Sequence, residues 1–209
     1  AIDSDAHNPG DLRFPREYGV FVARRGWARR RDVVNALTVE KMLGVEIPPR
    51  AQVIRIMMDE LTRIASHVLW WGAMAMDLGG MTPYFHAFRE RELINDIMEE
   101  TCGARLTMNY QVPGGVMADI HPNFQRRVKE IIKQLYKKLP EYDELVTGNV
   151  IFQARTQGIG YLSKEDAISY GVSGPSARAS GVSCDIRKLY PYEGYEKIQF
   201  NEVLHTTGD

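Results

Sequence analysis

The chain has 209 residues, a net charge of −1, 44% hydrophobic residues and 25% charged residues, the composition of an ordinary globular protein of one or two domains. A net charge this small gives no general argument for binding nucleic acid or an anionic membrane. The two cysteines, Cys102 and Cys184, exclude a disulfide framework, argue against a structural zinc site, and favour reduced thiols in an intracellular compartment. We find no apolar run of about 18 residues and no signal peptide, and we expect any membrane association to come through partner proteins.

Residues 1–34 differ from the rest of the chain. A short strand is predicted at 18–23, and an arginine-rich stretch follows, made up of Arg24, Arg25, Arg29, Arg30 and Arg31 around Trp27. This stretch could be a phosphate-binding arm for nucleic acid or lipid headgroups, or a solvated loop that pairs with acidic groups of a neighbouring protein. We favour the loop, because one short cluster in a neutral chain is a small electrostatic footprint.

Apolar residues at steps of three and four predict most of the remaining elements as helices. We expect a first helix over 33–43, ended by Gly44, and a second from Pro49 to Gly79-Gly80. A third is expected to have Thr82 as N-cap and Pro83 as first residue, and to end at Cys102-Gly103. A fourth is expected from His121-Pro122 to Pro140, and a short fifth over 141–146 before Gly148. On the third helix, the charged run 89–92 is expected to be a solvated or interfacial face.

Residues 111–116 are predicted to be a loop that needs the freedom of two glycines. Ser163 begins a capping box for a short helix that ends at Gly171. A small-residue loop is expected over 173–181, a charge pair between Asp185 and Arg187, and a strand over 198–203. The fold class is therefore mainly α: a helical bundle of four main helices, with short strand and loop segments at the ends.

Asp77 lies in the last turn of the longest predicted helix. Four carbonyls lack intrahelical partners there, and the macrodipole is negative. With Trp70, Ala73 and Met74 one and two turns back, the sequence predicts apolar surroundings, and both effects disfavour an ionised carboxylate. The common alternative is an aspartate that is exposed or bonded to a nearby backbone amide.

From residue 35 onward, a series of motifs resembles the quinone-site subunit of respiratory complex I, which is itself related to the large subunit of nickel–iron hydrogenases. The motifs run in order through 36–52, 63–67, 76–79, 81–85, 88–92, 103–105, 109–110, 113–116, Asp119, 174–175, 178–181, 185–188, 191–192 and Tyr195.

The resemblance implies a bundle that packs on an iron–sulfur subunit carrying the terminal cluster of NADH:ubiquinone oxidoreductase. Electrons would pass from that cluster to ubiquinone in a crevice between the two proteins, coupled to proton translocation. Asp77 matches the aspartate that pairs with a quinone-site histidine and is assigned to the proton path. The resemblance places Leu69, Ala73, Tyr84 and Phe88 along the quinone, and Arg105 and Thr107 against the iron–sulfur subunit. Ubiquinone is then a substrate, the cluster is held by the partner, and no metal or cofactor is expected on this chain alone.

Three departures from the family pattern bear on function. The N-terminal hairpin with the quinone-binding histidine is not matched. The partner tyrosine, expected before Leu37, is not matched either. The third departure is Thr107, which stands where many members have a histidine. We therefore expect the middle portion of the subunit: a non-matching extension over 1–34 and the central helical part over 35–209. Other chains would supply the missing N- and C-terminal portions, alongside further quinone-module and membrane-arm subunits, and no nucleic acid is expected as a partner. The expected location is the matrix side of the mitochondrial inner membrane, with the bacterial cytoplasmic membrane as the alternative. A structural subunit that has lost quinone chemistry is the alternative function.

Overall fold

The computed structural model describes residues 36–205, and side chains from Thr38 onward. The described chain is mostly helical, as predicted. The long helices are α3 (Pro49–Asp77), α4 (Met81–Cys102) and α5 (Phe124–Tyr142), and the short ones are α2 (Ala36–Leu43), α6 (Val150–Thr156), α7 (Lys164–Ser169), α8 (Gly174–Ala179) and α9 (Ile186–Leu189). A π-helical segment (Asp143–Thr147) extends α5, and a 3₁₀ turn covers Tyr195–Lys197. The described strands, β1 (Gln111–Val112) and β2 (Gly115–Val116), form one hairpin.

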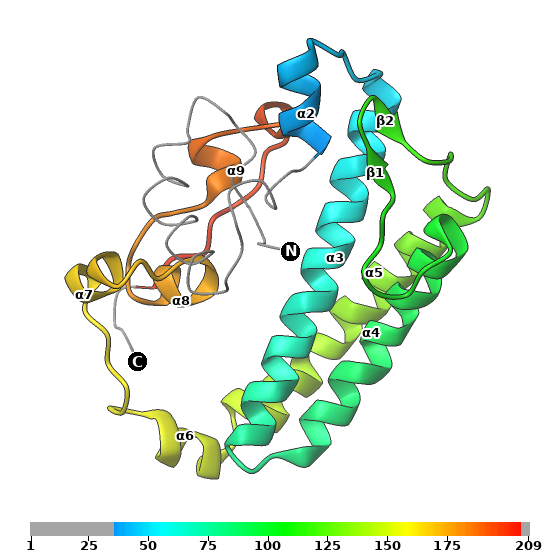
Figure 1. Cartoon of the computed structure of the whole chain (residues 1–209). Coiled ribbons are helices and arrows are strands. Elements are labelled where there is room, and N and C mark those ends of the chain that lie inside the picture. The colour runs from blue at the N-terminus through cyan, green and yellow to red at the C-terminus, as the bar shows by residue number, and fades with distance from the viewer. Residues whose placement is uncertain (1–35, 206–209) are drawn as a thin grey trace. The chain divides into compact units, whose positions relative to one another are not determined.

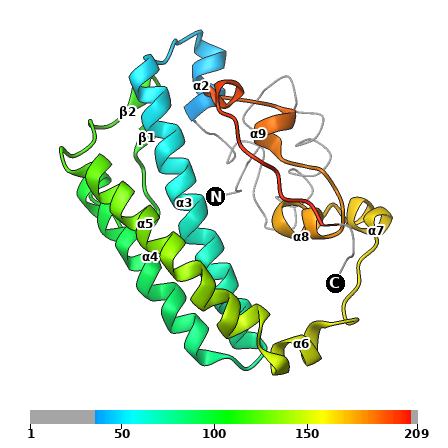
Figure 2. The same cartoon turned by 180° about the vertical axis from the view of Figure 1, so that it is seen from behind.

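The chain divides into two compact units. One comprises Ile54–Gln111 and Val116–Ile159, and the other comprises the residues up to Val53, Val112–Gly115 and the residues from Gly160. The first unit contains most of α3 together with α4, α5 and α6. Figures 1 and 2 show α3, α4 and α5 lying side by side in this unit.

The three long helices share one apolar core. Its buried side chains come from α3 (Ile54, Met58, Leu61, Ala65), α4 (Ile94, Ile97, Met98), α5 (Phe124, Ile131) and Tyr110. Further along, α3 and α4 approach so closely at Gly72 that a Cβ atom there would lie 2.6 Å from the Cβ atom of Ala87. A glycine at this point lets the backbones of the two helices come together.

The predicted bounds of α3 are confirmed, and those of α4 are confirmed at its end. Gly79 has a φ of +94°, and the amide of Gly80 donates to the carbonyl of Ala75 over 2.7 Å, which stops α3 after Asp77. Gly103, with a φ of +75°, ends α4. The prediction of Thr82 as N-cap and Pro83 as first residue is wrong: α4 begins at Met81, and Gly80 precedes it in an extended conformation without a side-chain cap.

The predicted stop at Pro140 is also wrong, since α5 continues through Pro140 to Tyr142 and then widens into the π-helical segment. A proline inside a helix removes its own amide donor and crowds the carbonyl four residues earlier, yet the helix continues through it here. In the wider turn that follows, Gly148 donates to the carbonyl of Asp143 over 2.7 Å. The separate helix predicted over 141–146 is therefore a continuation of α5. Helix α6, which begins after the cap Asn149, was not predicted.

In the other unit, the capping serine is confirmed: the Ser163 side chain accepts a hydrogen bond from the amide of Asp166 at the start of α7. The loop predicted over 173–181 contains helix α8 instead, with Pro175 in its first turn. Residues 198–203 form no strand, because alternation alone does not supply a neighbouring strand to pair with. The strand predicted over 18–23 and the arginine-rich stretch lie outside the described residues.

Candidate functional site

Asp77 is the last residue of α3, and its side chain is exposed. Asp77 is therefore not desolvated in this chain by itself, in agreement with the exposed alternative that the sequence left open. The reason is helical geometry: Ala75, only 2% exposed, faces the core, and two residues further on the helix has turned by about 200°. The side chain of Asp77 consequently lies on the face opposite the core.

Arg155 of α6, which sequence reasoning missed, binds the C-terminal end of α3, where the helix carbonyls lack partners. Its guanidinium donates a hydrogen bond to the carbonyl of Leu78, directly after Asp77. A cation at the C-terminus of a helix interacts favourably with the macrodipole and with the unpaired carbonyls. Since this contact joins residues 77 positions apart, no local pattern could have indicated it.

Large apolar side chains lie exposed around the turn from α3 to α4. Trp70 is 50% exposed, Met81 is 55% exposed and Phe85 is 61% exposed, and Met76 is exposed as well. Large apolar groups gathered at one corner are typical of a surface that a partner covers. The turn after Asp77 thus combines large exposed apolar side chains with the guanidinium of Arg155.

Tyr84 and Phe88 are half-buried neighbours on one face of α4. Their ring centroids lie 4.5 Å apart, and the ring of Phe85 lies 5.9 Å from that of Tyr84. Ala73, on the last turns of α3, is also half-buried. The structure therefore brings the two predicted aromatic residues into contact with each other.

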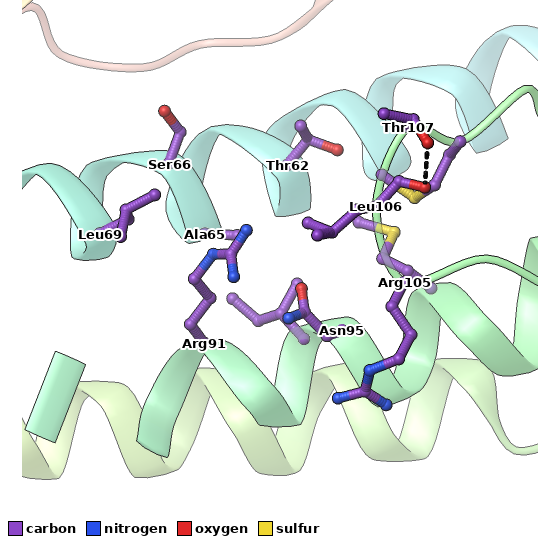
Figure 3. A pocket seen from close by; sticks show the side chains of 12 residues that line it. Thr62, Ala65, Ser66, Leu69, Arg91, Asn95, Arg105, Leu106 and Thr107 are labelled. Carbon is purple, nitrogen blue, oxygen red and sulfur yellow. Dashed lines mark hydrogen bonds between the residues drawn. The ribbon is translucent and has the colours of Figure 1, made fainter. Parts of the chain in front are cut away.

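Leu69, Arg105 and Thr107 line a different feature, a pocket of about 210 Å³. Its walls come from α3 (Thr62, Ala65, Ser66, Leu69), from α4 (Arg91, Ile94, Asn95, Met98) and from the segment that follows α4 (Arg105, Leu106, Thr107, Met108). Figure 3 shows Arg91 reaching from α4 toward α3, whereas the guanidinium of Arg105 points away from α3. Three of the seven predicted site residues therefore share one pocket, and Asp77, Ala73, Tyr84 and Phe88 do not line it.

Arg105 is held by carboxylates of its own chain. Its guanidinium lies 2.8 Å from Asp96 and 2.6 Å from Glu99, and it also pairs with Glu92. Hydrogen bonds with Asp96 and Glu99 raise the pKa of Arg105. These contacts fasten the segment after α4 to the last turns of that helix, and so fix the wall of the pocket.

Thr107 has a φ of +52°. A β-branched residue rarely adopts this left-handed conformation, and such strain costs on the order of 1–3 kcal/mol. Its hydroxyl donates to the carbonyl of Leu106 over 2.7 Å (Figure 3). Strained residues of this kind are concentrated at functional sites, and sequence patterns carry no signal for them.

The prediction that residues 89–92 form a solvated or interfacial face is wrong for Glu90. Glu90 is fully buried, where it accepts hydrogen bonds from Arg89 over 2.6 and 2.8 Å and from Gln134 of α5 over 3.1 Å. Arg91 is half-buried in the pocket. The packing of α4 against both α3 and α5 leaves too little of its surface free for four consecutive charged residues.

Among residues 36–205, no group of three or more histidine, cysteine, aspartate or glutamate side chains is arranged to hold a metal ion. Cys102 and Cys184 are not joined in a disulfide. No helix in the described part of the chain is both long and apolar enough to cross a membrane.

Comparison with known proteins identifies relatives of the whole bundle. The chain is 53% identical over 173 residues to the C/D subunit of NADH-quinone oxidoreductase from Bacteroides thetaiotaomicron. The aligned region covers 83% of this chain and 33% of that protein. It is 46% identical over 172 residues to the D subunit of NADH-quinone oxidoreductase from Clostridium beijerinckii, covering 82% of this chain and 46% of that one. The chain therefore spans about a third to a half of the length of these relatives.

Among solved structures, a chain of the membrane-bound sulfane sulfur reductase, an archaeal respiratory membrane complex, superposes with a TM-score of 0.78 at 35% identity, covering 82% of this chain and 46% of that one. The family model of the respiratory-chain NADH dehydrogenase 49 Kd subunit matches residues 77–209, well over half of the sequence. The resemblance seen in the sequence is confirmed, and this chain belongs to the family of the 49 Kd subunit of respiratory-chain NADH dehydrogenase.

Proposed function

We propose that this chain forms the central part of the quinone-site subunit of an NADH-quinone oxidoreductase. The names of its relatives support this role, as does the uninterrupted order of the family motifs. Reduction of a quinone to a quinol takes two electrons and two protons. In this proposal a cluster on a partner subunit delivers the electrons, and residues of this chain shape the site and supply a proton.

The observation that carries the proposal is the position of Asp77, exposed at the corner between α3 and α4 among uncovered apolar side chains. When a partner covers this corner, the carboxylate of Asp77 is enclosed beside the quinone headgroup. Asp77 then passes one of the two protons to a quinone oxygen as electrons arrive and takes a proton back from water, while the groups supplied by other parts of the subunit deliver the second proton. Leu69, Ala73, Tyr84 and Phe88 line the approach of the headgroup.

We further assign the pocket wall made by Arg105 and Thr107 to the contact with the iron–sulfur subunit. The strain at Thr107 and the fixed position of Arg105 support this assignment. A histidine and a tyrosine from other parts of the subunit would complete the quinone site. The double designation C/D in the name of the first relative supports neighbouring quinone-module subunits as partners. The chain would lie in the peripheral arm of a respiratory membrane complex, on the matrix side in mitochondria or the cytoplasmic side in bacteria.

The test is Asp77→Asn in the assembled complex. The amide keeps the size of the side chain and removes its proton-donating role, so we expect NADH-quinone reductase activity to fall by about 10²-fold or more. Electron transfer from NADH to a soluble one-electron acceptor, which bypasses the quinone, should stay within about twofold of the parent complex.

The matched control is Asp143→Asn, which changes another exposed aspartate of the same unit and should leave quinone reduction unaltered. Full quinone turnover in the Asp77→Asn complex would refute the catalytic role. That result would instead support the alternative, a structural subunit of the same complex. The observation that favours this alternative is Thr107, which stands where many members of the family have a titratable histidine.

A further inference from the structure

The pocket between α3 and α4 contains a cation that the described residues do not neutralise. Arg91 projects into it from α4, and its Nε atom is buried without a hydrogen-bond partner among the described residues. The contact found for its guanidinium is with the ring of Phe88, whose centroid lies 5.8 Å from Cζ. Leaving a buried guanidinium donor unsatisfied is costly, and the cost is removed when an acceptor enters the pocket.

The carboxylates nearest in sequence are bound elsewhere. Glu90 is held by Arg89 and Gln134, and Glu92 is held by Arg105. Glu92 also accepts a hydrogen bond from Asn95 over 3.1 Å, so both acids are engaged with residues other than Arg91. Figure 3 shows its guanidinium beside Ala65 of α3, whereas the hydroxyl of Ser66 points away from it.

The size and lining of the pocket limit what can occupy it. At about 210 Å³ it lies below the roughly 300–1,000 Å³ usual for cofactor and small-molecule sites. Its floor is apolar, from Ala65, Ile94 and Met98, while Asn95, Ser66 and Thr62 add polar groups beside Arg91. A side chain with a carboxylate at its tip fits within this volume and complements the charge of Arg91.

We propose that this pocket receives an aspartate or glutamate side chain of the neighbouring subunit and that Arg91 binds its carboxylate. The proposal rests on the proposed function in one respect, that a partner subunit covers this face. Charge complementarity supports a carboxylate as the occupant, and continuity supports a partner subunit as its source: Leu69, Arg105 and Thr107, predicted to contact the quinone or the iron–sulfur subunit, line the same pocket. Arg91 is thus an interface residue that anchors the partner, separate from the proton chemistry assigned to Asp77.

The first test replaces Arg91 in the assembled complex and measures how fast the neighbouring subunit dissociates as salt is raised. Losing one partner of a buried, hydrogen-bonded charge pair typically costs about 2 kcal/mol or more, so Arg91→Gln should speed dissociation by about 30-fold or more. Arg91→Lys keeps the charge but loses the planar fork, and should show an intermediate effect. The matched control is Arg126→Gln, an exposed arginine of α5 paired with Glu130, which should leave dissociation within about twofold.

The second test identifies the occupant directly. A photo-crosslinking residue in place of Thr62, an exposed residue of the pocket wall, should capture a peptide of a neighbouring subunit that contains an aspartate or glutamate. Exchanging the charges, with Arg91→Glu on this chain and that acid replaced by arginine on the partner, should restore slow dissociation even where Arg91→Glu alone prevents assembly.

Crosslinks confined to this chain, a captured peptide without an acidic residue, or equal dissociation of the Arg91→Gln and Arg126→Gln complexes would each overturn the proposal. The proposed function is judged separately, by quinone turnover in Asp77→Asn. If the Asp77→Asn complex keeps its quinone turnover and the Arg91→Gln complex loses its partner subunit, the catalytic role of Asp77 is refuted and the binding role of Arg91 is supported.

Discussion

Asp185 is a buried carboxylate, 6% exposed, that serves as the cap of α9. It accepts hydrogen bonds from the amide, Nε and Nη2 of Arg187 over 3.0, 3.0 and 2.6 Å. Burial raises the pKa of Asp185, but the hydrogen bonds and charge of Arg187 outweigh burial, so the net effect is a lowered pKa. The charge pair predicted from the sequence is thereby confirmed, and the structure adds that it is buried and caps a helix.

Asp185→Asn should lower the free energy of unfolding of the chain by about 1–3 kcal/mol at pH 7, because a hydrogen-bonded carboxylate becomes a neutral amide. A carboxylate whose pKa is lowered on folding stabilises the protein above its unfolded value of about 3.9, and this contribution is lost as the pH falls through the folded value. Urea unfolding at a series of pH values should therefore show the difference between parent and variant shrinking below about pH 4. A difference that stays constant down to about pH 3 would contradict this account.

At the scale of elements, α3 and α4 are joined by a close backbone approach as well as by their apolar stripes. A Cβ atom on Gly72 would lie 2.6 Å from the Cβ atom of Ala87 and 3.2 Å from the Cα atom of Tyr84. The second of these contacts is with backbone, which cannot rotate away. The position of Tyr84, and with it the pair Tyr84–Phe88, therefore depends on a residue that has no side chain.

Gly72→Ala should destabilise the chain by about 1–3 kcal/mol, the usual cost of overpacking. The sign of this change in stability is informative, because alanine would stabilise a helix relative to glycine by about 1 kcal/mol if it met no clash. The double variant with Ala87→Gly removes the atom that the new methyl group meets, and a double-mutant cycle measured by urea unfolding should give a favourable coupling of about 0.5 kcal/mol or more. Additive effects would show that the two helices are not in contact at this point.

At the scale of the whole molecule, the two compact units differ in how much they bury. The bundle unit has a continuous core across α3, α4 and α5, in which Ile94, Ile97 and Met98 are at most 1% exposed. Helix α6, at the end of the same unit, buries no side chain, and its Val150 is 77% exposed. In the other unit the helices α7 and α8 bury one alanine each, Ala167 and Ala177.

Native-state hydrogen exchange should follow this division, since local opening is easiest where few apolar contacts must break. We expect amides over 90–101 in α4 to exchange slowest, and those over 164–179 and over 150–156 to exchange at least about tenfold faster. Mass spectrometry of peptides from the exchanged chain provides the measurement. Equal protection across these three stretches would mean that the chain opens only as one cooperative body.

The sequence by itself determined the features that depend on a few neighbouring residues. Proline at the first turn and glycine just past the end set the bounds of α3, Gly103 ended α4, and Ser163 capped α7, because each acts through backbone geometry within one turn. The family could likewise be identified from the sequence, since its motifs are short stretches of residues that occur in a fixed order.

Only the tertiary structure decided which side of each helix meets another helix. It placed Glu90 in the interior, Asp77 at an uncovered corner and Arg91 in a pocket, and it carried α5 past Pro140. Burial depends on neighbours that are distant in the chain, so no pattern along the sequence encodes it.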